Sequence, residues 1–210
     1  MEIFRHWGIK FEAHLLHWGK VPMNLFVLSK DPVEAAQAHG DKHVVKMVLE
    51  AVQMLYSAHW TSAYPGLLEE RYSVRLAALQ RGLSVPDSMI DAPEKISGGH
   101  YRPVHLHHPC TIWIRACLGN YMWAVDLALA LATEYEFRYG KIHSCKAHAV
   151  WLKLNPPSLR PLPRMGFAVA MDPKFRVKGV VESYIKFYQE SKRERGLTTY
   201  TRRELPWFLE

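Results

Sequence analysis

The sequence predicts a mainly α-helical protein, a single-domain helical bundle with one or two short strands near its N-terminus. Apolar residues recur at helical spacing through most of the chain, Pro and Gly separate these segments, and no internal repeat is present. A chain of 210 residues is long enough to bury a sizeable core without disulfides. We therefore expect one helical domain over residues 23–210. Residues 1–22 are interpreted as an N-terminal extension that need not be native, because Met23 offers an alternative start.

In the first half of the chain, local signals mark the ends of the expected elements. Asp31-Pro32 combines a capping carboxylate with a proline at the first helical position, and Tyr64-Pro65-Gly66 breaks the chain. Residues 84–104 are rich in Pro, Gly, Ser and Asp, which is typical of a loop. The expected elements are a strand over residues 24–29, helices over residues 32–40, 41–58 and 67–82, and the loop over residues 84–104.

The second half is also expected to be helical. Pro109 can begin a helix, Gly119-Asn120 marks a boundary, and Gly140 ends the helix that follows. The apolar run over residues 121–132 is too short to span a bilayer and contains Asp126, so we interpret it as a buried helix. The expected helices cover residues 109–117, 121–139, 144–154 and 179–195, with a proline-rich connector over residues 156–163.

The charge of the chain is unevenly distributed. Residues 1–140 carry 13 Lys or Arg and 14 Asp or Glu, whereas residues 141–210 carry 14 and 6. This basic C-terminal third suits a polyanion such as nucleic acid, or an anionic membrane surface, although a merely solvated basic segment has the same composition. Three Cys residues without a CxxC pair favour reduced thiols, and no signal peptide is recognisable. We expect a cytoplasmic protein whose partner is DNA rather than a membrane.

The helix expected over residues 41–58 carries its polar side chains on a narrow strip. On a helical wheel they occupy roughly a third of the circumference, and apolar residues fill most of the rest. A surface helix shows the opposite proportion, so we expect this helix to be packed on two or three sides. The strip consists of Lys42, His43, Lys46, Glu50, Gln53 and Ser57.

Part of this strip has the residue types of a reactive site. Lys46, Glu50 and Gln53 follow one another at spacings of four and three, so their side chains form one row. Between apolar neighbours an amine loses proton affinity and a carboxylate gains it, which favours acid–base or nucleophilic chemistry near neutral pH. The alternative is an ion pair that fills a groove between helices. Our hypothesis is that the strip forms one wall of an active cleft, with the next two clusters opposite.

A second cluster is rich in histidine. His100, His105, His107, His108 and Cys110 lie within eleven residues, and in an extended segment His105 and His107 would point to the same side. Zinc binding, contact with a phosphate or base, and simple packing are the alternatives. No nearby carboxylate, HExxH or paired CxxC completes a metal site, so we expect no metal and assign His105 and His108 to substrate binding.

A third cluster, EYEFRYGKIH over residues 134–143, places aromatic rings between charges. Stacking surfaces that alternate with cations can hold a base and its phosphates, although a helix end packed by tyrosines gives the same pattern. The candidate substrate-binding residues in and beside this cluster are Asn120, Glu134, Arg138, Lys141 and His143.

The last basic run supplies the expected contacts to a phosphate backbone. Its cations lie beside Tyr200 and Trp207, and a solvated charge run is the alternative. The candidate backbone-contacting residues are Lys192, Arg193, Arg195, Arg202 and Arg203.

Taken together, four blocks resemble a family of small, mostly helical proteins found in phage genomes and environmental sequences. The blocks are NLFVLSKDPVEAAQAHGDKHVVKMVLEAVQML, HPCTIWIRACLGNYMW, EYEFRYGKIH and VVESYIKFYQESK, and the similarity runs from about Met23 to Phe208. Members show the same order of D-K-H-V-V-K-M, H-P-x-x-x-W and E-Y-x-x-R-Y-G-K-x-H. The resemblance implies enzymes that act on modified pyrimidines in phage DNA, including glycosylases that excise hypermodified bases. The helix-hairpin-helix glycosylase signature is not visible in this sequence.

This resemblance leads us to expect a DNA glycosylase for a hypermodified pyrimidine, working without a cofactor. The target base would leave the stack and lose its sugar bond through an oxocarbenium-like transition state. Asp41 or Glu50 would stabilise that cation or orient water, and Lys46 or Lys42 would attack the sugar carbon if a lyase step follows. The catalytic residues expected are Asp41, Lys46 and Glu50, and Lys42, His43 and Gln53 join the substrate-binding residues.

Other functions also fit the sequence. A transferase that modifies pyrimidine bases in DNA would need a second substrate. A metal-dependent phosphohydrolase or nuclease would use His105, His107 and His108 with a carboxylate from a helix. A non-enzymatic DNA-binding or phage-interaction module would leave the strip with a purely structural role.

Overall fold

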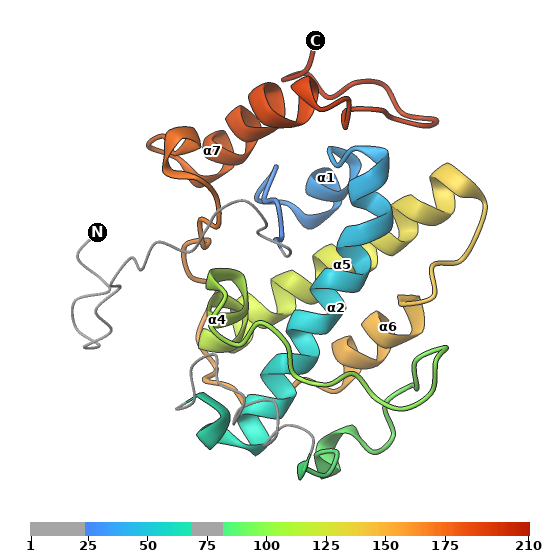
Figure 1. Cartoon of the computed structure of the whole chain (residues 1–210), viewed down its shortest axis with the longest axis vertical. Helices are drawn as coiled ribbons and strands as arrows, with labels where there is room; N and C mark the ends of the chain where they lie inside the picture. Colours follow the sequence, from blue (N-terminus) through green and yellow to red (C-terminus); the bar gives the residue numbers. More distant parts are fainter. Residues whose placement is uncertain (1–23, 69–81) are drawn as a thin grey trace.

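Two long helices, α2 (Asp41–Ala63) and α5 (Leu118–Tyr139), cross at the centre of the protein in a computed structural model that describes residues 24–68 and 82–210 (Figure 1). Shorter helices surround this pair, and α5 contacts α1, α4 and α6 as well as α2. The predicted extension over residues 1–22 and most of the helix predicted over residues 67–82 lie outside the described residues. The shorter elements are α1 (Pro32–Gln37), η3 (Pro65–Leu68), η4 (Asp87–Met89), α4 (Pro109–Ala116), α6 (Lys146–Leu154), η5 (Pro173–Phe175), α7 (Val180–Phe187) and the π-helical turn η6 (Tyr188–Lys192).

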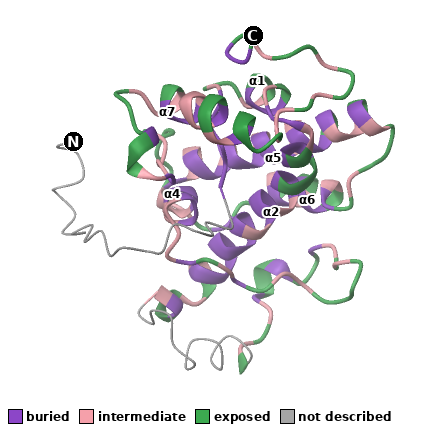
Figure 2. Ribbon diagram, turned by 45° about the horizontal axis from the view of Figure 1, so that its top comes forward, coloured by how far each residue is buried: buried purple, intermediate pink, exposed green. Residues whose placement is uncertain are grey.

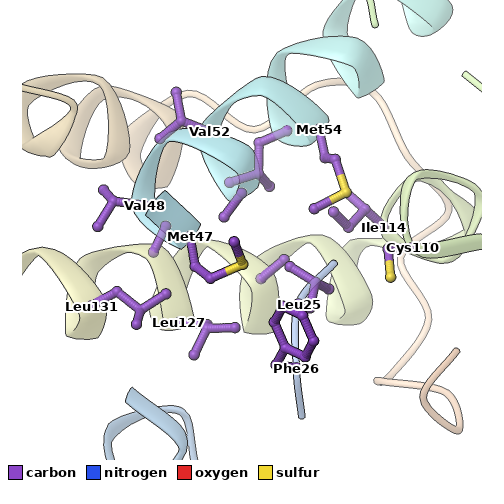
Figure 3. Close-up of a cluster of buried hydrophobic side chains, with 14 of the residues drawn as sticks. Leu25, Phe26, Met47, Val48, Val52, Met54, Cys110, Ile114, Leu127 and Leu131 are labelled. Atoms are coloured by element: carbon purple, nitrogen blue, oxygen red, sulfur yellow. The ribbon is translucent and has the colours of Figure 1, made fainter. Parts of the chain in front are cut away.

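The core confirms that α2 is packed on several sides. Fifteen of its 23 residues are buried, and Figure 2 shows the burial along both α2 and α5. Figure 3 shows side chains such as Met47 and Val48 of α2 beside Leu127 and Leu131 of α5. The prediction of a mainly α-helical, single-domain protein is confirmed for the described part of the chain.

Capping residues explain where several helices begin and end. The carboxylate of Asp31 accepts hydrogen bonds from the backbone N–H groups of Val33 and Glu34, at 2.8 and 2.9 Å, so α1 begins where the sequence predicts. Pro109 opens α4, and Gly140 ends α5 with a φ of 63°. That left-handed conformation favours glycine, which is why the predicted stop holds.

The strand predicted over residues 24–29 does not form. Asn24 uses its side-chain oxygen to accept the backbone N–H groups of Leu25 and Phe26, at 2.8 and 3.1 Å. Phe26 has a φ of 43°, which no strand adopts. Residues 24–28 are all buried, so this irregular segment inserts its side chains into the core instead of pairing with a neighbouring strand.

The proline-rich connector covers the beginning of α5. Its carbonyl groups at Arg160 and Leu162 accept hydrogen bonds from the backbone N–H groups of Leu118 and Gly119, at 2.8 and 3.0 Å. The first backbone N–H groups of a helix have no acceptor inside the helix, and here the connector supplies the acceptors. α5 therefore begins at Leu118, three residues before the helix predicted over residues 121–139.

The chain between α4 and α5 bends sharply at Cys117. Among the described residues, no single helix has both the length and the apolar character needed to cross a bilayer. α4 and α5 reach that length and character only as a pair, and they are bent by 119° relative to each other.

The helix predicted over residues 179–195 is divided. α7 is α-helical from Val180 to Phe187, and the chain then widens into the π-helical turn η6. The C-terminal segment, defined here as residues 197–210, returns to the beginning of α2. There the backbone N–H of Asp41 donates to the carbonyl of Thr199 at 2.8 Å, and the Tyr200 hydroxyl donates to the carbonyl of Ala38 at 2.9 Å.

Candidate active site

The two carboxylates of α2 that were expected to be catalytic lie in different environments. At the first turn of α2, Asp41 faces α5 and the C-terminal segment. Further along the helix, Glu50 faces Asn24 and the π-helical turn. Each environment draws its partners from distant parts of the chain, and the two differ in how completely their charges are neutralised.

Arg138 of α5 lies at the centre of the first environment. It is only 1% exposed, and its guanidinium donates to Glu134 at 2.7 Å, to Asp41 at 2.9 Å and to the carbonyl of Gln37 at 3.0 Å. The planar guanidinium presents donors in several fixed directions, which suits three acceptors on three different elements. Arg138 therefore joins α1, α2 and α5.

Arg203 of the C-terminal segment completes this ion-pair network. It holds both carboxylate oxygens of Glu134, at 2.9 and 2.8 Å. Burial acts to raise the pKa of Glu134, but the hydrogen bonds from Arg203 and Arg138 outweigh it and keep the pKa low. The same balance lowers the pKa of Asp41, where hydrogen bonds from Thr201 and Arg138 outweigh burial.

This ion-pair network changes the interpretation of four predicted site residues. Glu134 and Arg138 were expected to bind substrate, Asp41 to be catalytic and Arg203 to contact a DNA backbone. Their charged groups are instead paired with one another, which fixes the C-terminal segment against α2 and α5. Arg202 beside them is exposed and donates to the carbonyl of Phe137 at 3.2 Å.

Asn120 and His143 also have structural partners. The buried amide of Asn120 donates to the carbonyl of Trp113 at 2.8 Å and accepts from the backbone N–H of Met165 at 2.7 Å. The ring of His143 contacts the carbonyl of Val45 at 3.0 Å and accepts the backbone N–H of Cys145 at the same distance. Backbone groups therefore occupy the polar atoms of both side chains, whereas Lys141 is exposed beyond the end of α5.

The histidine cluster is spread around the beginning of α4. His108 caps α4 by accepting the backbone N–H of Cys110 at 3.2 Å, and its ring centroid lies 6.5 Å from that of the exposed His105. Burial lowers the pKa of His108 to about 4. No group of three or more His, Cys, Asp or Glu side chains within residues 24–68 and 82–210 is placed to hold a metal ion.

His43 belongs to an aromatic cluster between α2 and α7. Its ring stacks on Phe26, with the centroids 4.5 Å apart, and its Nδ1 atom is hydrogen-bonded to the hydroxyl of Tyr188. Burial lowers the pKa of His43 to about 2, with Lys192 adding to the effect. His43 is thus a neutral packing residue that holds α2 against the π-helical turn.

Glu50 is the buried carboxylate of the second environment. Its side chain is 6% exposed, and it accepts hydrogen bonds from Lys46 at 2.8 Å and from the backbone N–H of Asn24 at 3.1 Å. Burial raises the pKa of Glu50, and the opposing effects of Lys46, of the Asn24 amide and of Lys192 do not cancel it. The predicted Lys46–Glu50 row exists, with the Lys46 side chain 60% exposed.

Lys192 faces the same carboxylate from the π-helical turn. The residue is 7% exposed, and its ammonium lies 5.1 Å from the ring centroids of both Phe26 and Phe187. Sequence reasoning assigned Lys192 to the DNA backbone because it opens a run of exposed charges. Arg193 and Arg195 in that run are exposed as expected, but Lys192 turns inward. We call Lys46, Glu50, Lys192 and Phe26 the Glu50–Lys192 cluster.

The remaining strip residues flank this cluster. Lys42 is exposed and Gln53 is partly buried. Asn24 was not predicted as a site residue, but its backbone N–H donates to Glu50 and its side-chain oxygen accepts the hydroxyl hydrogen of Tyr184 at 2.9 Å. The only available signal was its place at the start of a run of apolar residues.

Two cavities lie close to the C-terminal segment. One has a volume of about 830 Å³ and is lined by residues of α1, α7 and the C-terminal segment, including the exposed Trp207. A second, of about 570 Å³, shares Gln37 and Arg203 with the first. Neither cavity is lined by Glu50 or Lys192. The first is linked to the aromatic cluster because Phe208 in its wall packs against Tyr188.

Comparison with known protein families, characterised proteins and solved structures finds no match to this chain.

Proposed function

We propose that this protein is a DNA glycosylase that excises a modified pyrimidine base, with Glu50 as its catalytic carboxylate. The observation that carries the proposal is the environment of Glu50, a buried carboxylate with a raised pKa that faces two amines, Lys46 and Lys192. Carboxylates whose pKa is shifted by burial and by nearby charges concentrate at functional sites.

Base excision is favoured by a negative group near the sugar and a positive group near the departing base. As the bond between the base and C1′ breaks, the sugar gains positive charge and the departing base gains negative charge. Ionised Glu50 would stabilise the sugar cation or orient water towards it, because a carboxylate in a partly desolvated site interacts strongly with developing charge. Lys46, with its exposed side chain, would face the phosphate or the departing base.

The surrounding charge supports a nucleic-acid substrate. Arg193 and Arg195 follow Lys192 and are exposed, and Lys42 is exposed at the beginning of α2. Cations that contact phosphates release counterions, so binding should weaken as salt increases. Because Arg203 is paired with Glu134, the backbone contacts in this proposal belong to Arg193 and Arg195 and not to Arg203.

The test is incubation of the protein in EDTA with unmodified DNA and with DNA that carries bulky modified pyrimidines. Released base and abasic sites are scored for the wild type, for Glu50→Gln and for the control Glu136→Gln. The control removes a carboxylate from a partly exposed pair with Lys146, outside the Glu50–Lys192 cluster. We expect base release by the wild type and the control, and its loss in Glu50→Gln.

Two results would contradict the proposal. Wild-type rates of base release in Glu50→Gln would remove the carboxylate from the mechanism. Intact DNA on every substrate would reject the glycosylase activity itself. Adding candidate group donors to the same reactions identifies a transferase, because that enzyme would increase the mass of the base instead of releasing it.

A further inference from the structure

Lys192 has the surroundings of a reactive amine. Its ammonium lies 5.1 Å from the centroids of two neighbouring aromatic rings, and within the described residues it makes no hydrogen bond or ion pair. The carboxylate of Glu50 influences its charge through space only. Buried lysines are normally paired, since an unpaired ammonium away from water is costly. The faces of the Phe26 and Phe187 rings attract a cation and so offset part of the cost of burying this ammonium.

The backbone at Lys192 is also unusual. η6 spans Tyr188–Lys192 in a π-helical conformation, and Lys192 is its last residue. Isolated π-helical turns are rare, weaken regular helix geometry and occur frequently at functional sites. Here the turn aims a lysine from a charged run towards α2, where Glu50 and Lys46 lie.

The charges around Lys192 favour its neutral form. Burial lowers the pKa of Lys192 to about 8, and the positive charges of Arg195 and Lys46 act in the same direction. Glu50 opposes them. His43, the nearest histidine on α2, carries no charge near neutral pH because burial keeps its pKa low. A substantial fraction of the amine is therefore unprotonated in mildly alkaline solution, where an ordinary lysine is almost entirely charged.

We propose that Lys192 is a catalytic nucleophile that forms a Schiff base with C1′ of the deoxyribose from which the base departs. The substrate in this inference rests on the proposed function, and the chemistry adds a covalent step to it. Lys192 replaces the two lysines that the sequence suggested for this role. Lys46 is largely exposed and paired with Glu50, and Lys42 is exposed.

The step is balanced without an external oxidant or reductant. The lone pair of the Lys192 Nζ atom attacks C1′, the bond from C1′ to the base breaks, and the base leaves with its electron pair and takes up a proton. The nitrogen loses a proton to Glu50 in its ionised form. Glu50 then returns that proton to the ring oxygen as the bond from C1′ to this oxygen opens, which leaves an iminium ion between Nζ and C1′. Water hydrolyses the iminium ion to the aldehyde and restores the amine.

Borohydride trapping tests this inference on the full-length protein. DNA with a preformed abasic site presents the C1′ aldehyde directly, so the reaction does not depend on which base is recognised. Reduction of the iminium ion converts it to a stable amine, and peptide mapping of the cross-linked protein identifies the lysine. We expect the adduct on Lys192, with a trapping rate that rises through pH 8 as the amine loses its proton.

The variants separate chemistry from folding. Lys192→Arg keeps a positive charge beside the Phe26 and Phe187 rings but cannot form a Schiff base, so the adduct should be lost while thermal unfolding stays cooperative. Lys186→Ala is the matched control, because Lys186 lies on α7 and contacts the carbonyl of Lys174 at the surface. This control should give the wild-type yield of adduct.

The outcomes distinguish this inference from the proposed function. An adduct on another lysine, or a wild-type yield from folded Lys192→Arg, would overturn the role of Lys192. Base release from modified DNA without any trapped adduct would also overturn it, while supporting the glycosylase. A trapped adduct at Lys192 on abasic DNA, without base release from any modified DNA, would support the Schiff-base role of Lys192. The same result would reject the proposed glycosylase activity.

Discussion

Replacing Arg138 with methionine should destabilise the protein strongly. The substitution keeps an unbranched apolar stem and removes the guanidinium that joins Glu134, Asp41 and the carbonyl of Gln37. Glu134 is 3% exposed, so its remaining partner, Arg203, must neutralise it alone. Removing one partner of a buried ion pair costs about 3–5 kcal/mol, because the other charge stays buried without compensation.

Equilibrium unfolding in urea, followed by tryptophan fluorescence, measures this loss. For a domain of this size the loss corresponds to a fall in Tm of roughly 6–20 °C. Lys153→Met is the matched control, since Lys153 pairs with Asp126 at the surface and the two side chains are 37% and 42% exposed. A pair of this kind contributes about 0–1 kcal/mol.

The reasoning would be refuted by equal losses in Arg138→Met and Lys153→Met. A second comparison isolates the unpaired charge as the cause. Combining Arg138→Met with Glu134→Gln removes the carboxylate that the first substitution leaves behind, so the double variant should lose less stability than the sum of the two single variants. Strict additivity would show that Arg138 acts through packing and not through charge.

Two further predictions concern pH and packing. His39, His43 and His59 are buried with pKa values lowered to about 4, 2 and 4, so the folded state excludes protons that the unfolded state binds below pH 6.5. Their contribution to the free energy of unfolding is complete above that pH and is lost as the pH falls. The expected loss is roughly 4 kcal/mol between pH 6 and pH 5. An unfolding free energy from urea transitions that stays constant over this interval would contradict the prediction. Gly119→Ala would place a Cβ atom 2.3 Å from a backbone nitrogen of the chain that covers α5, whereas Gly66→Ala meets nothing within 4 Å. Gly119→Ala should lower the free energy of unfolding by about 3 kcal/mol, and Gly66→Ala by far less, as measured by thermal or urea unfolding. Similar losses in the two variants would show that the backbone covering α5 moves aside at little cost.

The helical architecture could be predicted because its signals are local. The cap at Asp31, the proline at Pro109 and the stop at Gly140 each act within one turn of the chain, and all three hold in the structure. The predicted strand at residues 24–29 fails for a reason outside local propensity. The Asn24 side chain takes the N–H groups that a strand would use, and the surrounding helices bury the whole segment.

The candidate site could be predicted only in part, because spacing along α2 does not show which distant residue faces each carboxylate. Asp41 and Glu50 both belong to α2. Thr201 and Arg138 lower the pKa of Asp41 against the effect of burial, whereas burial prevails at Glu50 and raises its pKa. The first carboxylate became part of a stabilising ion-pair network, and the second kept the properties expected of a reactive group.

Lys192 shows how a change in helix geometry can hide a buried residue from sequence analysis. Tyr184, Tyr188 and Lys192 are spaced four residues apart, and all three are buried. In a regular α-helix each step of four residues rotates the side chain by about 40°, so Lys192 would lie about 80° from Tyr184 and move towards the solvent with its charged neighbours. The π-helical turn has more residues per turn and reverses part of that drift, which keeps Lys192 on the same face as the two tyrosines. A constant helical period would place this amine with the exposed arginines. In the structure the amine is buried instead, where the charge of Glu50 raises its pKa against the effect of burial.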